Sequence, residues 1–336
     1  MEFTAGGRMD VRITPSDVGK RVSVRCLRDA GDGLGTFTDT VGVLTSWDEG
    51  VLLITRKSGE SVRIPESSMV AGKTVPAAPA RRRGPAASFA ELAGVQARAW
   101  QPVESEPLGE WTLRAAHGFT RRANSVLPLG DPGVPLDEAL TRVRAWYGKR
   151  GLPPYLQVAT GAADTQEALC AALEERGWRR EVSAEVRVGA LAPLADAAAQ
   201  PGAGLSRDPD SAWLRRYQRV GEPAPHMVRV LEAGPSVWFA TIPGAASEDV
   251  PAAIGRCVVD GRWAGFMAVE VAPERRREGL ATAVMAALAA RALEEGASAA
   301  WLQVETGNQA ARTMYAGMGF AVHHLYHHFR ASEAGT

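Results

Sequence analysis

Hydrophobic and polar residues alternate along the first part of the chain, and this pattern predicts short β-strands. The alternation is clear at residues 21–26, 41–45 and 60–64, and residues 51–55 form a nearly continuous apolar run. Glycine-containing turns separate these segments. We therefore expect a small all-β domain over residues 10–75, built of roughly five strands in the manner of an SH3-like barrel.

Beyond residue 88 the pattern changes to helices that alternate with strands. Apolar side chains recur at helical spacing in residues 136–150, and residues 155–158 have the composition of a strand. A helix is then expected at 166–176 and a closing strand at 180–188. The first half of this region therefore predicts an α/β lobe.

A second α/β segment occupies the C-terminal part of the chain. The pattern predicts two helices, three strands, a helix, a strand, a further helix around Tyr315 and a final strand. The ranges, apart from that of the further helix, are 208–220, 225–233, 237–242, 253–259, 262–271, 282–295, 301–304 and 321–330.

The two segments share a repeated unit. The tripeptide Leu-Gln-Val occurs at 156–158 and again at 302–304. In each copy a helix follows, and it ends at a glycine before an aromatic residue, Trp178 or Phe320. The order helix, strand, helix, strand therefore predicts one supersecondary unit that is present twice.

Charge and cysteine content narrow the classes of protein that the chain can represent. Its 336 residues are enough for two or three domains. Its 38 basic and 38 acidic residues give no net charge that would attract the protein to nucleic acid or to a membrane. Three cysteines lie far apart in the sequence, no apolar run approaches about 18 residues, and we recognise no signal-peptide core. We therefore expect a cytoplasmic protein that is not bound to a membrane.

An anion-binding turn is predicted where the strand at 262–271 gives way to a helix. The free amides and the positive dipole end of a helix N-terminus bind groups such as pyrophosphate, and a glycine allows close approach of the backbone. A basic βα turn without a ligand is the alternative. The candidate binding residues are Arg276, Arg277, Glu278, Gly279, Leu280, Ala281 and Thr282.

A second motif follows the later Leu-Gln-Val strand. Asn308, Ala311, Tyr315 and the pair Gly319-Phe320 fit N-x-x-A-x-x-x-Y-x-x-x-G-F, and residues 276–281 fit R/Q-x-x-G-x-G/A. With both motifs in this order, the chain resembles the GNAT superfamily of acyl-CoA-dependent N-acetyltransferases. With its N-terminal β region, it resembles a bacterial group described as histone-acetyltransferase-like with an SH3 domain.

The resemblance implies an α/β (α+β) GNAT fold in tandem, with a degenerate first lobe. In the first lobe, Leu173 stands where the second has Tyr315, and Asp131 and Pro132 stand in the loop that corresponds to the basic turn. Asp131 would repel phosphate, and Pro132 lacks an amide donor. The expected parts are an SH3-like barrel at 10–75, a linker at 76–87, the degenerate lobe at 88–192 and the catalytic lobe at 204–332.

The resemblance also implies acetyl-CoA as the acyl donor and a primary amine that attacks it directly. Val269, Glu270 and Val271 would anchor the pantetheine through their main chain, and one of their amides would polarise the thioester carbonyl. Tyr315 would be the general acid, with packing alone as the alternative, because a phenol of pKa about 10 can protonate a thiolate. Asn308 would cap its helix and bind the cofactor.

The general base is left open by the sequence. In relatives of the ribosomal-protein type, a glutamate often precedes the asparagine by five residues, and here Gln303 occupies that position. Glu305 and Glu270 are the nearby carboxylates. Glu305 is the first choice because it lies where the two central strands are expected to part.

The sequence identifies the residues that would bind the acceptor amine less clearly than those that would bind the donor. Trp213, Tyr217 and His226, on the two helices that open the second lobe, are candidates for the acceptor border, and core packing is the alternative for the two aromatic residues. The acceptor is a protein lysine, a protein N-terminus or a small amine. The N-terminal barrel would dock a protein or nucleic acid, or have a purely structural role, and the oligomeric state is not determined by the sequence.

Four histidines lie in the last strand. Alternation predicts His323 and His327 on one face and His324 and His328 on the other. No carboxylate or cysteine nearby in the sequence completes a metal site, so we interpret them as groove-lining or surface residues and expect no metal.

Two classes of function therefore compete. An active N-acetyltransferase is favoured by the intact turn and by Tyr315. The alternative is a catalytically silent acyl-CoA-binding protein with a regulatory or scaffold role.

Overall fold

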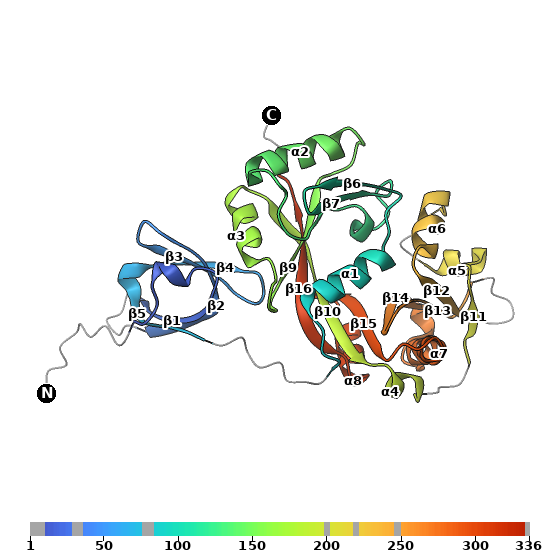
Figure 1. Cartoon of the computed structure of the whole chain (residues 1–336). Helices are drawn as coiled ribbons and strands as arrows, with labels where there is room; N and C mark the ends of the chain where they lie inside the picture. The colour runs from blue at the N-terminus through green and yellow to red at the C-terminus, as the bar shows by residue number, and fades with distance from the viewer. Residues whose placement is uncertain are drawn as a thin grey trace, which may run out of the picture. The chain divides into compact units, whose positions relative to one another are not determined.

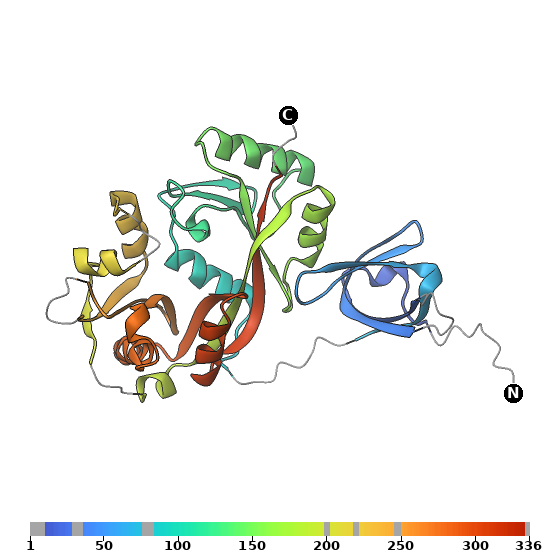
Figure 2. The same ribbon diagram turned by 180° about the vertical axis from the view of Figure 1, so that it is seen from behind.

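The computed structural model describes most of the chain, namely residues 11–28, 36–75, 84–197, 202–217, 222–244 and 250–332. The chain divides into two compact units, one of residues 1–81 and 158–179 and the other of residues 82–157 and 180–336. Figures 1 and 2 show it from opposite sides. Most of the predicted linker, with its three arginines, lies outside the described residues.

A five-stranded antiparallel sheet forms the N-terminal part of the first unit, in the order β4-β3-β2-β1-β5. Its strands are β1 (Arg21–Arg28), β2 (Thr36–Asp48), β3 (Val51–Thr55), β4 (Ser61–Pro65) and β5 (Met69–Thr74). Alternating apolar residues such as Val22, Leu44 and Ile54 form its core, which confirms the predicted small β region. Among the described residues no pairing of β4 with β5 closes the sheet, so the SH3-like barrel stays a prediction.

A mixed eight-stranded sheet is the centre of the α/β part of the chain. In spatial order its strands are β11 (Gly204–Ser206), β12 (Ser236–Ile242), β13 (Ala253–Asp260), β14 (Trp263–Val271), β15 (Ala299–Glu305), β10 (Arg179–Ala190), β16 (Ala321–Arg330) and β9 (Tyr155–Thr160). The strands predicted from the hydrophobic pattern are present at these positions.

The two halves of this sheet are interleaved. Strand β10 comes from the first lobe, yet it lies between β15 and β16 of the second lobe (Figure 1). It is antiparallel to β15, with a register that runs from Ala184 opposite Glu305 to Ala190 opposite Ala299. The sheet is therefore continuous across the boundary that the sequence suggested between residues 192 and 204.

A small three-stranded sheet and the helices complete the fold. The small sheet consists of β6 (Glu104–Leu108), β7 (Trp111–Ala115) and β8 (Leu127–Pro128). The helices are α1 (Phe89–Ala99), α2 (Leu136–Gly148), α3 (Glu167–Glu175), α4 (Ala192–Ala195), α5 (Ser211–Arg216), α6 (Pro225–Glu232), α7 (Leu280–Glu294) and α8 (Gln309–Gly317). None of the helices in the described ranges is long and apolar enough to cross a membrane.

Two hydrophobic cores cover opposite faces of the part of the sheet around β14 and β15. The first core joins α1, α5 and α6 to one face, and the second joins α7 and α8 to the other (Figures 1 and 2). Gly265 is needed where Trp301 packs across the parallel pair β14–β15, because a Cβ there would lie 2.4 Å from the indole. Strands β14 and β15 are therefore packed on both faces, each face against a different set of helices.

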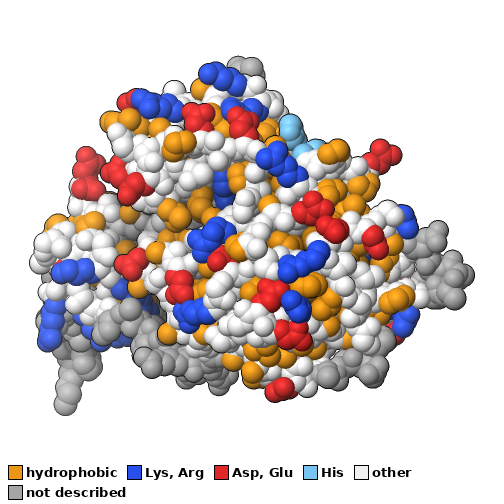
Figure 3. All heavy atoms as spheres, turned by 45° about the vertical axis from the view of Figure 1, so that its right-hand side comes forward, with side chains coloured by type: hydrophobic (Ala, Val, Ile, Leu, Met, Phe, Trp, Pro, Cys, Tyr) orange, Lys and Arg blue, Asp and Glu red, His pale blue; other side chains and the backbone are white. Residues whose placement is uncertain are grey.

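Charged side chains of both signs are mixed on the face that Figure 3 shows. Figure 3 shows Lys and Arg interspersed with Asp and Glu on one face, as the equal numbers of the two kinds in the sequence suggest. That face carries no broad single-sign area of the kind that nucleic-acid binding favours.

Candidate functional site

Strands β14 and β15 part halfway along their length. They pair in parallel from Trp263 opposite Ala299 to Phe266 opposite Leu302, and the pairing ends there. The cause lies in a β-bulge, since Ala268 has a φ of 53° and the register of β14 against β13 shifts at this point. The main chain of β14 after the bulge therefore has an edge that β15 does not cover, and this edge includes the predicted residues Val269, Glu270 and Val271.

The predicted anion-binding turn follows directly. A short 3-10 helix (η4, Pro273–Arg275) leads to Arg277 and Gly279, whose φ values are 68° and 81°, and α7 begins at Leu280. Residues 276–279 are all exposed, so the turn is open to a ligand. Gly279 suits its left-handed conformation, which strains a residue with a Cβ.

The N-terminus of α7 has no side-chain cap. Gly279 offers no side-chain acceptor, and the bond from the Ala283 amide to the Gly279 carbonyl oxygen, at 3.0 Å, closes the first helical turn. By helix geometry the amides of Leu280, Ala281 and Thr282 have no acceptor within the helix. Such donors, together with the helix dipole, are the groups that bind a pyrophosphate, and the binding itself stays a prediction.

The charges of the turn are unevenly paired. Arg275 Nε donates to Glu278 Oε2 at 2.8 Å, so this carboxylate is neutralised from within, and the second carboxylate, Glu274 of η4, is exposed. Arg276 and Arg277 form no ion pair with any described residue. The turn therefore keeps two exposed cations for an anionic ligand.

Tyr315 lies on the same side of the sheet as α7. Its half-buried ring packs against the core that contains Leu280 and Val304, and it makes an edge-to-face contact with Phe320 at 6.0 Å between ring centroids. No described residue hydrogen-bonds the Tyr315 hydroxyl. Loss of water around the ring raises the pKa of Tyr315 to about 12, so the phenol stays protonated at neutral pH.

Asn308 begins the helix that carries Tyr315. Its Oδ1 accepts a hydrogen bond from the Ala311 amide at 3.1 Å, which confirms its predicted role as the cap of α8. Its side chain is exposed, and its contact with a cofactor stays a prediction.

The two candidate bases lie on different strands. Glu305 is exposed at the end of β15, and its carbonyl oxygen accepts from the Asn308 amide at 3.0 Å. Glu270 is half-buried on β14, opposite Ile254 of β13. The strands already part after Leu302, so Gln303, whose Nε2 donates to Gln96 Oε1 of α1 at 2.6 Å, lies nearer the point of parting than Glu305.

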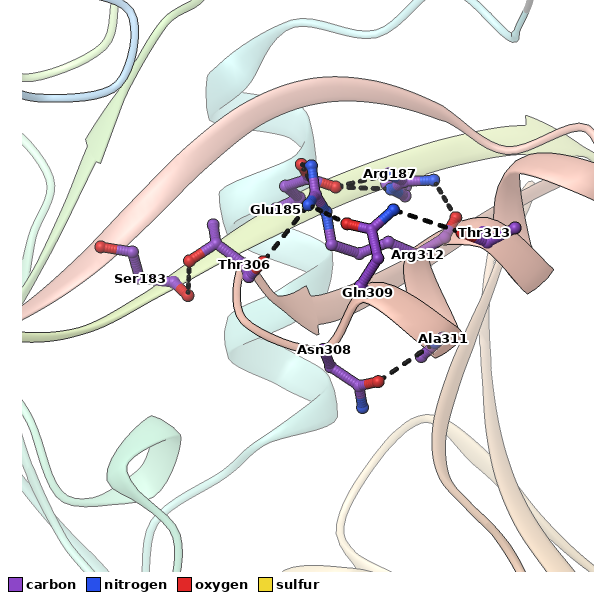
Figure 4. Close-up of polar contacts among 9 residues, drawn as sticks. All are labelled: Ser183, Glu185, Arg187, Thr306, Asn308, Gln309, Ala311, Arg312 and Thr313. Atoms are coloured by element: carbon purple, nitrogen blue, oxygen red, sulfur yellow. Dashed lines mark hydrogen bonds and ion pairs between the residues drawn. The ribbon is translucent and has the colours of Figure 1, made fainter.

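A buried ion-pair network holds α8 on the sheet, and sequence reasoning missed it (Figure 4). Glu185 of β10 receives hydrogen bonds from Arg187 Nε at 2.7 Å and from Arg312 Nη2 of α8 at 2.8 Å. Arg187 Nη1 also donates to the carbonyl oxygen of Arg312 at 2.9 Å. Burial alone would raise the pKa of Glu185, but the bonds from Arg312 and Arg187 lower it below its usual value. A first-lobe strand therefore fixes the helix of Tyr315.

The signal for this network was present in the sequence. Opposite charges two residues apart, in the otherwise apolar stretch 184–190, point to one face and require partners there. The partner Arg312 could not be identified, because nothing in the sequence places β10 beside α8.

The candidate acceptor residues separate into two groups. Trp213 and Tyr217 are buried in the first core, with the Trp213 ring 5.1 Å from that of Phe239, as the packing interpretation expected. His226 is half-buried, and its ring lies 4.8 Å from that of His117. Burial, and then the charge of His117, lower the pKa of His226. Of the three, only His226 reaches the surface of the structure.

The interpretation of the strand histidines as surface residues is wrong for three of them. His324, His327 and His328 are buried, because β16 is an inner strand of the sheet rather than an edge. His327 Nδ1 lies 2.7 Å from Ser183 Oγ of β10. Within the described ranges, no three His, Cys, Asp or Glu side chains are grouped to hold a metal ion.

Comparison with known proteins agrees with this geometry. Residues 87–329 match the family described as "Probable histone acetyltransferase Rv0428c C-terminal". The chain is 30% identical over 324 residues to the probable histone acetyltransferase Rv0428c of Mycobacterium tuberculosis, which covers 95% of this chain and 97% of the relative.

Solved structures show the same fold. A GCN5-related N-acetyltransferase from Kribbella flavida aligns with a TM-score of 0.54 at 16% identity, over 74% of this chain and 98% of its own. A tandem GNAT protein from the clavulanic acid biosynthesis pathway aligns with a TM-score of 0.52 at 14% identity, over 77% and 93%. The resemblance to GNAT proteins seen in the motifs is thereby confirmed at the level of the family and the fold.

Proposed function

Since the chain belongs to the GNAT-type acetyltransferase family of Rv0428c, we propose that it transfers an acetyl group from acetyl-CoA to a primary amine by direct attack. One observation carries this proposal. The open, uncapped turn at Gly279 and the protonated phenol of Tyr315 border one core, beside two strands that part. These are the elements that a pyrophosphate, a leaving thiolate and a thioester need.

The turn would hold the donor by its phosphates. The amides of Leu280, Ala281 and Thr282 point along the helix axis, and Arg276 and Arg277 add exposed positive charge. Acetyl-CoA supplies the activated acyl group when it is bound. The uncovered main-chain edge of β14 would align the donor at Val269, Glu270 and Val271.

Tyr315 would deliver the proton to the departing sulfur. Its raised pKa keeps the phenol protonated, and its half-buried position shields the proton from bulk water. The incoming amine must be neutral, and Glu305 or Glu270, directly or through a water, would accept its proton. Glu305 has the advantage of exposure at the open end of β15.

Release of free thiol from acetyl-CoA with a panel of amines tests the proposal. We expect Tyr315→Phe to lower kcat by about 10- to 100-fold, since general-acid catalysis contributes on the order of 10² or more, while the Kd for acetyl-CoA stays within about twofold. Glu305→Gln and Glu270→Gln distinguish the two bases. If wild type binds acetyl-CoA but no amine or protein supports turnover, the scaffold alternative gains instead.

The N-terminal sheet is proposed as a docking module, with an SH3-like barrel as its expected shape. Large exposed hydrophobic residues of the described chain concentrate there, and Leu27 pairs with Phe37 across β1 and β2. An apolar surface favours a protein over a nucleic acid. Loss of a co-purifying partner on Phe37→Ser, with turnover on small amines unchanged, would support this role.

A further inference from the structure

The first lobe contains an arginine whose positive charge no described carboxylate neutralises. Arg122 lies in a short 3-10 helix (η3, Arg121–Ala123), and its Nε donates to the Tyr326 hydroxyl of β16 at 3.1 Å. Its guanidinium carbon is 5.5 Å from the centre of the Trp100 ring. No described carboxylate pairs with Arg122, whereas its neighbour Arg121 pairs with Glu181 at 2.9 Å. Two terminal nitrogens of Arg122 therefore remain available.

Two buried arginines nearby are also without a carboxylate in the described structure. Arg114 donates only to neutral oxygens, two of Ser125 at 2.9 Å and Gln157 Oε1 at 3.1 Å. Arg256 donates to main-chain oxygens at the ends of α1 and α6 and lies 5.1 Å from the Trp100 ring centre. Because these oxygens carry only partial charges, the neighbourhood of Trp100 is electropositive.

Buried ring nitrogens near Arg122 lack hydrogen-bond partners, and one of the two in the neutral His328 ring is a donor. Trp100 Nε1 and both ring nitrogens of His328 are buried, and no described residue bonds to them. The His328 ring lies 5.4 Å from that of Tyr326, which itself holds Arg122. Buried polar groups are rarely unpaired, and an unseen ligand or water is a common reason. Three observations of different kinds thus indicate an anion here.

This cluster lies on the face of the sheet that the turn and Tyr315 leave free. Gln96 of α1 bonds to Gln303 of β15, just past the last pair of β14 and β15, and Trp100 follows one helical turn later, about 6 Å along the axis. Arg256 contacts Met267 Sδ at 2.6 Å, one residue before the bulge at Ala268. The first core contains Trp100 and Met267 together, whereas Tyr315 packs against the second.

We propose that the acceptor amine carries a carboxylate, which the two free terminal nitrogens of Arg122 bind in a bidentate manner. This inference rests on the proposed acetyl transfer, because it assigns the acceptor class of that same site. Guanidinium and carboxylate match in plane and charge, and Trp100 supports the guanidinium from below. A lysine in a strongly basic segment fits poorly, since the charge of Arg122 would repel it.

The experiment compares amino acids with their decarboxylated amines, for example lysine with 1,5-diaminopentane and ornithine with 1,4-diaminobutane. Thiol release gives kcat and KM for wild type, Arg122→Gln, Arg122→Lys and the control Arg121→Gln. We expect Arg122→Gln to lower kcat/KM for the carboxylate-bearing amine by about 10- to 100-fold, through KM, and for its decarboxylated partner by less than about twofold. Arg122→Lys should recover part of the loss, and Arg121→Gln should match wild type.

Failure of the two proposals can be told apart. If wild type turns over both members of each pair equally, or if Arg122→Gln affects both alike, the carboxylate assignment is overturned while acetyl transfer stands. If no amine is turned over, calorimetric titration of lysine into the CoA complex decides. Binding by wild type that Arg122→Gln weakens keeps the anion site, and equal or absent binding removes it.

Discussion

The two lobes differ in the charge of the side chains at the N-terminus of one helix, which is α7 in the second lobe and α2 in the first. In the second lobe, α7 begins after an exposed glycine with no acidic residue in its first turn. In the first lobe, α2 begins after Pro135 with Asp137 and Glu138 in its first turn. The preceding loop is closed by its own carboxylates, because Asp131 Oδ1 accepts from the Gly133 amide and Glu110 Oε2 from the Asp131 amide, both at 2.6 Å.

A helix N-terminus can therefore be used in two ways. Negative side chains in its first turn satisfy it internally and stabilise the helix by about 0.3–1 kcal/mol each. A glycine turn without such groups gives up that stability and leaves donors for a ligand. The helices α3 and α8, which follow the two Leu-Gln-Val strands, differ in a similar way. Helix α3 carries the fully buried Leu173 at the position where α8 carries the half-buried Tyr315.

Replacing the glycine of the open turn should have the largest effect. Valine at position 279 must leave φ 81°, so the amides of α7 would no longer converge on one anion. Loss of two charge-assisted hydrogen bonds weakens the Kd for acetyl-CoA by about 100-fold or more, and the rise in Tm on adding acetyl-CoA should disappear.

Gly133→Val is the matched control for this change. Gly133 has a φ of 73° in the closed loop, so the substitution brings similar strain. It should lower the Tm of the free protein and leave the rise on adding acetyl-CoA intact. Loss of that rise in Gly133→Val as well would mean that the two turns do not differ in the way described.

Adding a carboxylate to the open turn should convert it partly to the closed type. Ala281→Glu puts an acid in the first turn of α7, as Glu138 does in α2. We expect about 10-fold weaker binding of acetyl-CoA by calorimetry, since repulsion of about 1.4 kcal/mol is a tenfold change, and slightly higher stability without ligand. Ala281→Gln controls for size, and equal affinities of the two variants would refute a charge effect.

The smallest expected effect is the change in folding stability with pH that the Tyr315 phenol causes. Its pKa is raised to about 12 in the fold, against about 10 in the unfolded chain, so the folded state holds this proton more tightly. The resulting stability is complete below pH about 10 and is lost as pH rises toward about 12. Denaturant unfolding of wild type and Tyr315→Phe should therefore show wild type losing more stability across that window. Parallel curves would place the phenol in water.

Local chemistry made the turn conformation and the helix cap of the candidate site predictable. Gly279 and Asn308 act on the backbone next to them. Gly279 adopts a left-handed conformation that forms the turn, and Asn308 caps α8 by accepting a hydrogen bond from the Ala311 amide. Such roles depend on neighbours in the chain, so spacing alone reveals them. The open turn and the cap were both visible in the sequence for this reason.

Long-range pairing was not predictable in the same way. The hydrophobic pattern gave β10 as a closing strand, but its neighbours β15 and β16 lie more than a hundred residues away. Hence the partners of Glu185 and the burial of His324 and His328 were missed, because both depend on what covers each face of a strand.

The position of β10 bears on which part of the chain the second lobe needs in order to fold. A polypeptide that begins at residue 204 would leave the neighbouring edges of β15 and β16 without their shared partner, and exposed strand edges invite aggregation. The first half of the chain is thus needed to complete the sheet. Strand β10 ties the first half to the sheet of the second, whether or not the N-terminus of helix α2 binds a ligand of its own.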